Sequence, residues 1–190
     1  HYSVVDGEGH AVVVTSTLEN WYGSRIVADG TGIMLNNEMG DFNPIPGVTD
    51  TTGYIGTKPN LVEPGKRMLS SMTPTIILQN GKPWALLGAV GGRTIINSVL
   101  QGVLNLVDFQ MNIAVAVEAG RIHHQWFPDH ILVERSLLSG SLQKELEARG
   151  HRIERTFRMG PMNGLLIDPK TGMREGAADS RDPDARAVGY

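Results

Sequence analysis

Two β-hairpin signals constrain this chain most strongly, because each one specifies two strands and the turn between them. In the first, residues 2–5 and 11–18 are apolar or β-branched and flank the turn sequence Asp6-Gly7-Glu8-Gly9. In the second, residues 75–78 and 84–87 flank Gln79-Asn80-Gly81-Lys82, in which Asn-Gly is typical of a tight type I′ turn. Both signals predict antiparallel strand pairs.

The first hairpin begins at His1, with neither a methionine nor a leader sequence before its apolar strand. Chain ends usually fray, so a terminus built into a sheet is unusual. We expect that the chain is cut at this point from a longer precursor. The alternative is that the end itself has a function.

Composition limits the classes of protein to which the chain can belong. A length of 190 residues, 41% hydrophobic and 19% charged, is typical of one ordered domain. The net charge is -3 and the basic residues are spread along the chain, which argues against a nucleic-acid binder. No apolar run approaches the roughly 20 residues needed to span a bilayer. The absence of cysteine excludes disulfides and thiolate chemistry.

The remaining elements follow from periodicity and capping residues. We predict helices over residues 95–107, 113–119 (capped by Asn112) and 141–148, and strands over 32–35, 131–134, 152–157 and 164–168. This order favours stacked sheets covered by helices, a layered α+β domain, over a parallel β–α alternation. The charged tail, residues 177–190, is predicted to cover a surface, with an ordered loop at 179–183 as the alternative.

Several polar clusters allow a structural and a functional interpretation. Glu38 and Asp41 beside two asparagines form either a capped turn or a pocket for a cation such as an ammonium. Ser70 and Ser71 form either a simple turn or a pair of hydroxyls directed at an anion. Gly91-Gly92, between a strand and a helix, would let backbone N–H groups approach a ligand, although no phosphate-loop pattern is present.

His123, His124, Asp129 and His130 suggest a metal site only at first sight. Adjacent residues of an extended segment point to opposite faces, so His123 and His124 do not readily share one ion. No HExxH spacing is present either. We therefore favour structural hydrogen bonding for these histidines.

Five stretches of sequence occur in a fixed order along the chain: TSTLE at 15–19, NNEMGDF at 36–42, PGKRMLSSMTPTI at 64–76, GAVGGRTI at 88–95 and RIHHQWFPD at 121–129. Together they resemble the small, C-terminal subunit of the gamma-glutamyltransferase (gamma-glutamyltranspeptidase) family over essentially the whole chain. The resemblance implies an α+β fold, the αββα four-layer sandwich of N-terminal-nucleophile hydrolases. It also implies one domain over residues 1–190, completed by a separate large subunit that self-processing cuts from the same precursor zymogen.

In this family the small subunit begins Thr-Thr-His-Tyr-Ser, and the first threonine is the nucleophile. Its own α-amino group acts as the base, because a hydroxyl is a weak nucleophile until a neighbouring amine takes its proton. The present sequence begins at His1, so the nucleophilic threonine is expected just upstream of it. His1 itself is not assigned that role.

The resemblance assigns further roles one residue at a time. Thr17 would support the nucleophile, and Glu19, where family members have Asn or an acid, would contact the α-amino or α-carboxylate end of the substrate. Glu38 and Asp41 would hold the α-ammonium, since a buried ammonium needs paired negative charge.

Other assigned positions face the acyl group and the α-carboxylate. Ser70 and Ser71 would receive the α-carboxylate, together with an arginine of the large subunit. The backbone N–H groups of Gly91 and Gly92 would form the oxyanion hole. Residues 43–60 would form a lid, with Tyr54 as the aromatic residue of its gate.

The implied reaction is γ-glutamyl transfer from glutathione or similar amides to water, amino acids or peptides, with no metal and no cofactor. The family also implies a periplasmic or secreted location. A glutaryl or cephalosporin acylase is one alternative, but its substrate lacks the α-ammonium that Glu38 and Asp41 would bind. A non-catalytic γ-glutamyl-binding homologue is another. The missing threonines favour it, and the intact Thr17, serine pair and glycine pair disfavour it.

Overall fold

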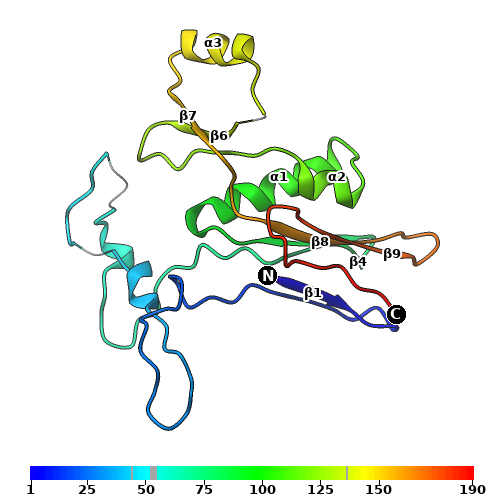
Figure 1. Cartoon of the computed structure of the whole chain (residues 1–190), viewed down its shortest axis with the longest axis horizontal. Helices are drawn as coiled ribbons and strands as arrows, with labels where there is room; N and C mark the ends of the chain where they lie inside the picture. Colours follow the sequence, from blue (N-terminus) through cyan, green and yellow to red (C-terminus); the bar gives the residue numbers. More distant parts are fainter. Residues whose placement is uncertain (44, 52–54, 136) are drawn as a thin grey trace. The chain divides into compact units, whose positions relative to one another are not determined.

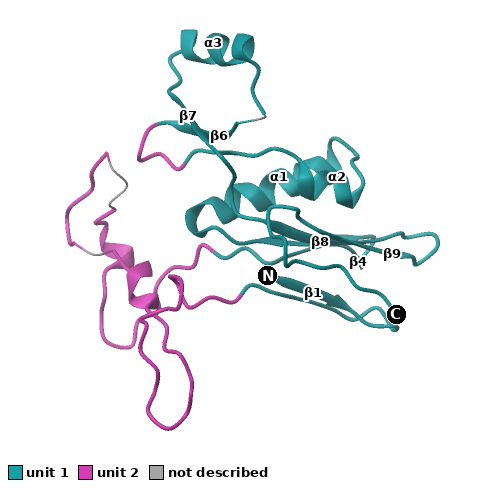
Figure 2. Cartoon of the chain, viewed as in Figure 1, with its two compact units in different colours: residues 1–15, 72–124, 130–190 teal, residues 16–71, 125–129 magenta. Residues whose placement is uncertain are grey.

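The structure is a computed structural model of residues 1–190, and it describes the chain except for residues 44, 52–54 and 136 (Figure 1). The chain divides into two compact units (Figure 2). Unit 1 comprises residues 1–15, 72–124 and 130–190, and unit 2 comprises residues 16–71 and 125–129. The prediction of one domain over the whole chain stays a prediction.

A four-stranded antiparallel sheet is the centre of unit 1, with the strand order β3-β4-β8-β9. Its strands are β3 (Thr75–Gln79), β4 (Lys82–Ala89), β8 (Met162–Ile167) and β9 (Arg174–Ala178). The predicted turn between β3 and β4 is confirmed, because Asn80 and Gly81 have φ values of 52° and 78°, as a type I′ turn requires. β9 was not predicted, since its sequence REGAA has little apolar character and it forms by pairing with β8.

The N-terminal hairpin is confirmed as β1 (Tyr2–Val5) paired with β2 (Ala11–Val14), although β2 is shorter than the predicted 11–18. A third sheet has β5 (Ile122–His123) antiparallel to β6 (Ile131–Glu134). β6 is parallel to β7 (Ile153–Thr156), and α3 (Gly140–Ala148) lies in the connection between them. The predicted strand at 32–35 is wrong, because that segment forms only the isolated bridge Val27–Met34.

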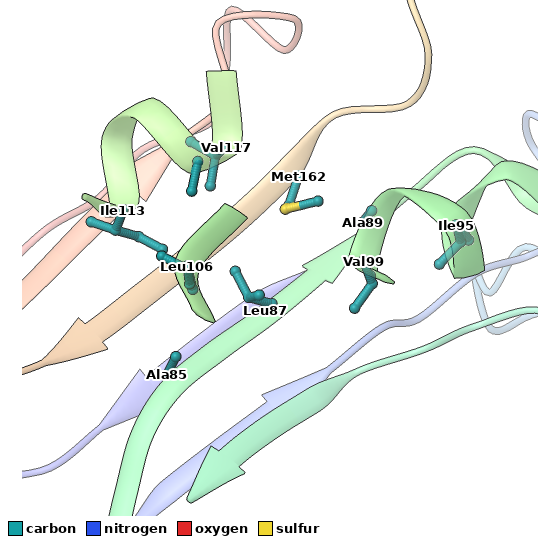
Figure 3. Packing of buried hydrophobic residues seen from close by; sticks show 10 residues of the cluster. Ala85, Leu87, Ala89, Ile95, Val99, Leu106, Ile113, Val117 and Met162 are labelled. Atoms are coloured by element: carbon teal, nitrogen blue, oxygen red, sulfur yellow. The ribbon is translucent and has the colours of Figure 1, made fainter. Parts of the chain in front are cut away.

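Two helices, α1 (Ile95–Val107) and α2 (Ile113–Glu118), pack on one face of the four-stranded sheet. Both were predicted, and the Asn112 side chain caps α2 by accepting a hydrogen bond from the Val115 N–H at 2.9 Å. The core between helices and sheet contains Leu87, Val99, Leu106, Ile113, Val117 and Met162 (Figure 3). The β1–β2 hairpin packs on the opposite side, against β4 and β8 (Figure 1).

β4 is buried on both faces, which explains its continuous apolar sequence Trp84-Ala85-Leu86-Leu87-Gly88-Ala89. Ala85, Leu87 and Ala89 belong to the core under the helices. Because side chains alternate along a strand, Leu86 and Gly88 face the hairpin. No helix in the described part of the chain is long and apolar enough to cross a membrane.

A buried ionic network anchors the segment that follows β9. Asp179 is 1% exposed and accepts hydrogen bonds from the Arg121 guanidinium at 2.7 Å, the Arg181 guanidinium at 2.9 Å and the Met162 N–H at 2.9 Å. Arg181 also pairs with the buried carboxylate of Glu134. The expectation that the tail merely covers a surface is therefore wrong at residues 179–181, where the ordered-loop alternative is confirmed.

Charge and burial act in opposite directions on Asp179. Burial alone would raise its pKa, but the Arg181 backbone N–H and the Arg121 guanidinium hold the pKa of this carboxyl below its ordinary value. Its stabilising contribution is thus complete above the ordinary aspartate pKa of about 4 and is lost as the pH falls through the lower folded-state value.

We predict that Asp179→Ala lowers the free energy of unfolding by about 3–5 kcal/mol, because it leaves two guanidinium groups without their shared carboxylate in a buried site. Urea unfolding of the purified protein measures this. The control Asp184→Ala, at an exposed tail position, should change stability by no more than about 0.5 kcal/mol. Equal effects of the two substitutions would contradict the structural role of the network.

Candidate functional site

Three acidic side chains come together in unit 2. Glu19, Glu38 and Asp41 each offer a carboxylate oxygen, and these oxygens lie within 4.8 Å of one another. Glu38 and Asp41 are the first and last residues of the 3-10 helix η1 (Glu38–Asp41), in which positions three apart lie on the same side. The predicted proximity of Glu38 and Asp41 is confirmed, and Glu19 joins them from the loop that follows the hairpin.

Local hydrogen bonds position Glu19. Its backbone N–H donates to the Thr17 hydroxyl at 2.8 Å, and its φ of 75° lies in the left-handed region that non-glycine residues seldom adopt. Gly40 faces its carboxylate, where an added Cβ would lie 3.4 Å from Glu19 Oε1. Thr17, a predicted site residue, is thus in direct contact with Glu19 through the backbone.

The acidic pair is also held by asparagines, as the capped-turn interpretation predicts. The Glu38 N–H donates to Asn36 Oδ1 at 3.0 Å, and the Asn20 N–H donates to Asn37 Oδ1 at 3.1 Å. Capping and ligand binding are therefore compatible here, because the caps use backbone N–H groups and leave the carboxylates directed at one another.

The electrostatics of the cluster favour a cation. Glu38 Oε1 is buried and accepts no hydrogen bond from the described part of the chain. Burial first, and then the negative charge of Asp41, raise the pKa of Glu38 above its ordinary value. A cation with N–H donors would satisfy this oxygen and remove the like-charge repulsion at once.

Asn60, which the sequence analysis did not single out, ties the acidic helix to the segment that carries the serines. It is buried, and its side-chain amide donates to the Asp41 carbonyl at 2.7 Å and to Asn43 Oδ1 at 3.2 Å. Its Oδ1 accepts from the Leu69 N–H at 3.0 Å, next to Ser70. Asn60 is the last residue of the 3-10 helix η2 (Lys58–Asn60). In the sequence it is one polar residue among several in a proline-containing loop, so no local pattern predicts that its side chain makes these contacts.

Two other predictions in unit 2 remain predictions. Ser70 is exposed and Ser71 half-buried in the segment before β3, an arrangement that fits either interpretation of the pair. In the predicted lid, residues 43–60, the Asn43 side chain donates to the Thr57 carbonyl at 2.6 Å. Tyr54, its predicted gate residue, lies outside the described residues.

The glycine pair belongs to unit 1, at the junction of β4 and α1. Gly91 and Gly92 have φ values of 123° and 58°, which disfavour any side chain, and the 3-10 helix η3 (Gly92–Thr94) begins here. The Thr94 hydroxyl donates to the Gly91 carbonyl at 2.9 Å and closes the turn. Both glycines are exposed, so the predicted position at a strand-to-helix junction is confirmed, whereas their role is a prediction.

The histidines are arranged as the alternation argument predicts. His123 is buried, with its Nδ1 at 3.0 Å from the Asn97 side-chain amide, whereas its neighbour His124 is exposed. Among the described residues, the group with suitable spacing for a metal is Glu19, Glu38 and Asp41, and it contains no histidine.

Comparison with known proteins gives consistent matches over the whole chain. A family model described as Gamma-glutamyltranspeptidase matches residues 1–189. The chain is 45% identical, over its full 190 residues, to the glutathione hydrolase proenzyme of Escherichia coli K12. It spans about a third of that relative's length (32%).

Solved structures agree with this match. The Helicobacter pylori gamma-glutamyltranspeptidase T380A mutant superposes with a TM-score of 0.90 at 42% identity, over 96% of this chain and 99% of that one. The cephalosporin acylase from Bacillus halodurans gives a TM-score of 0.74 at 25% identity, over 87% of this chain and 29% of that one. The predicted fold class is confirmed by these neighbours.

We predict that Asp41→Asn lowers the pKa of Glu38 toward its ordinary value, because the substitution removes the nearby negative charge and leaves only the effect of burial. A carboxyl-detected NMR titration of the folded protein measures the change. Asp29→Asn, in the exposed turn near residue 30, is the matched control and should leave the Glu38 titration unaltered. An unchanged Glu38 pKa in Asp41→Asn would show that the two carboxylates do not interact.

Proposed function

The chain belongs to the gamma-glutamyltranspeptidase family, and from this premise we propose that the protein of which it is part transfers γ-glutamyl groups. Its donors are glutathione and other γ-glutamyl amides, and its acceptors are water, amino acids and peptides. The observation that carries the proposal is the group formed by Glu19, Glu38 and Asp41, with a buried acceptor oxygen that suits an α-ammonium.

The proposed chemistry is acyl transfer through the first of the two threonines that precede the histidine in the family sequence Thr-Thr-His-Tyr-Ser, just upstream of His1. The threonine hydroxyl gives its proton to the threonine's own amine and attacks the γ-carbonyl carbon of the substrate. The C–N bond of the amide then breaks, and the leaving amine takes up the proton. Water or an acceptor amine next attacks the γ-glutamyl ester, which releases the product and the threonine hydroxyl. This route uses neither a metal nor an organic cofactor.

Residues of the chain would serve distinct parts of the substrate. Glu38 and Asp41 bind the α-ammonium, with Glu19 beside them, and Ser70 and Ser71 receive the α-carboxylate. The Gly91 and Gly92 N–H groups stabilise the oxyanion, and Thr17 supports the nucleophile. Binding at the non-reacting end of the substrate would orient the γ-carbonyl for attack.

The exposed apolar face of the hairpin supports the proposal of a large partner subunit from the same precursor. Val4 and Val12 are paired across β1 and β2, and they are 53% and 54% exposed. Tyr2 adds to this face at 55% exposure. Paired apolar side chains on an uncovered sheet face are typical of a surface that another chain covers. A periplasmic or secreted location is proposed on the family resemblance alone.

A glutaryl or cephalosporin acylase is the second candidate, because the chain also resembles the Bacillus halodurans acylase. A glutaryl group has the same γ-acyl chain but no α-ammonium. The two functions therefore make different demands on Glu38 and Asp41, and comparing two substrates that differ only in this group separates them.

We predict that Asp41→Ala raises KM for a γ-glutamyl anilide by tenfold or more and changes KM for the glutaryl anilide by less than about twofold. The physical reason is the loss of one charge-assisted hydrogen bond to the ammonium. Steady-state kinetics on both substrates measure this, with Asp29→Ala as the surface control. Equal losses on the two substrates would remove Asp41 from ammonium recognition, and a wild-type preference for glutaryl would favour the acylase.

We predict that Gly92→Val lowers kcat by about 100-fold while KM changes little, because a β-branched residue at a φ of 58° displaces an N–H group that acts in the transition state. Gly30→Val is the matched control, since Gly30 has a φ of 72° and open space around it. Similar turnover in Gly92→Val and the wild type would exclude the glycine pair from the oxyanion hole.

A further inference from the structure

His1 has no role in the proposed reaction, yet unit 1 holds it closely. Ser3, Thr15, Gly88 and Asn163 surround it, and we call this group of four residues the His1 seat. The imidazole Nδ1 of His1 lies 2.7 Å from the Thr15 hydroxyl and its Nε2 lies 3.2 Å from the Ser3 hydroxyl. His1 and Thr15 are one position beyond the pair Tyr2–Val14, so the hairpin register itself brings them opposite one another. The ring orientation is thereby fixed from the hairpin side.

Gly88 of β4 forms the floor of this seat. A Cβ added at Gly88 would lie only 2.0–2.5 Å from three atoms of the His1 imidazole. Glycine inside a strand usually weakens it, and such a position marks the close approach of another group. Here the approaching group is the His1 ring, so the absence of a side chain at Gly88 is what lets the ring lie against the sheet.

Asn163 of β8 also contacts His1, and it is paired with Gly88 in the strand register. Its side-chain amide donates to the His1 backbone carbonyl at 3.1 Å. Its Oδ1 is buried and has no hydrogen-bond partner in the described part of the chain. A buried amide with one half unsatisfied costs stability, so a residue of this kind indicates a role other than stabilising the sheet.

We propose that Gly88 and Asn163 are positioning residues that hold both the ring and the backbone of His1, and thereby fix the segment just upstream of it. This inference rests on the proposed function, in which the nucleophilic threonine belongs to that upstream segment. β4 connects the two parts of the site. Gly88, which contacts His1, lies three residues before Gly91, and Gly91 is the first residue of the proposed oxyanion hole. The same strand thus sets the positions of the upstream segment and of the oxyanion donors.

The first test uses the full-length precursor with Gly88→Ala, with Asn163→Leu, and with the control Gly140→Ala, whose added methyl meets open space. We expect both seat variants to lower kcat by tenfold or more with KM within about twofold, because misplacing a nucleophile affects the reacting step and leaves recognition of the ammonium unchanged. The control should match the wild type. Seat variants with wild-type kcat would overturn the proposal.

A double-mutant comparison shows whether Gly88 acts through His1. In a His1→Ala background the added methyl meets no imidazole, so Gly88→Ala should cost less than about twofold in kcat there. An equal loss in both backgrounds would overturn the proposal, since it would show that the methyl group disturbs β4 itself. Inactivity of the wild-type protein on γ-glutamyl substrates would instead refute the proposed function, which keeps the two failures distinct.

Intact mass and thermal melting complete the experiment. A Gly88→Ala precursor that melts within a few degrees of the wild type, yet is cleaved more slowly, supports the proposal, because the same upstream segment would contain the bond to be cut. If Gly88→Ala does not fold, Asn163→Leu decides the question through its kcat. A folded, cleaved and fully active Asn163→Leu protein would then overturn the proposal.

Discussion

The C-terminal half of unit 1 depends on the hydrogen bonds that the buried carboxylate of Asp179 accepts. It accepts hydrogen bonds from Arg121, which follows α2, and from the Met162 N–H at the start of β8. Through Arg181 it is also connected to Glu134 at the end of β6. Charges removed from water are tolerated only when their hydrogen bonds are complete, so the network requires all these elements to be in place together.

β4 connects the core to the candidate site, because its two faces contact different parts of unit 1. Ala85, Leu87 and Ala89 pack beneath α1 and α2, and Gly88 on the other face receives His1. After β4 ends at Ala89, the chain continues to Gly91 and Gly92, where positive φ values turn the backbone toward α1. A strand fixed on both faces has little freedom to shift, which suits a part of the molecule that positions reacting groups.

Much of this fold is predictable from the sequence, because the signals are local. The Asn80-Gly81 turn, the Asn112 cap and the apolar periodicity of residues 95–107 each determine structure through neighbouring residues alone.

The errors of the sequence analysis occur where structure depends on contacts between residues far apart in the chain. β9 has no apolar pattern and exists because β8 offers an edge, whereas the apolar residues at 32–35 find no partner strand and form a single bridge. Asp179 is buried and Arg181 half-buried because the Arg121 guanidinium and the Glu134 carboxylate, 58 and 47 residues away, complete their hydrogen bonds.

The candidate site shows the same division. The sequence by itself determined the residue types, the order of the motifs and hence the family, and it determined the proximity of Glu38 and Asp41, since their spacing matches one turn of a tight helix. Only the tertiary structure decided that Glu19 joins them, that Asn60 connects Asp41 to Leu69, and that Gly88 and Asn163 enclose His1. The physical reason is that these contacts join residues 9 to 162 positions apart. A chain sequence does not specify which distant groups will satisfy one another's hydrogen bonds until the fold has brought them together.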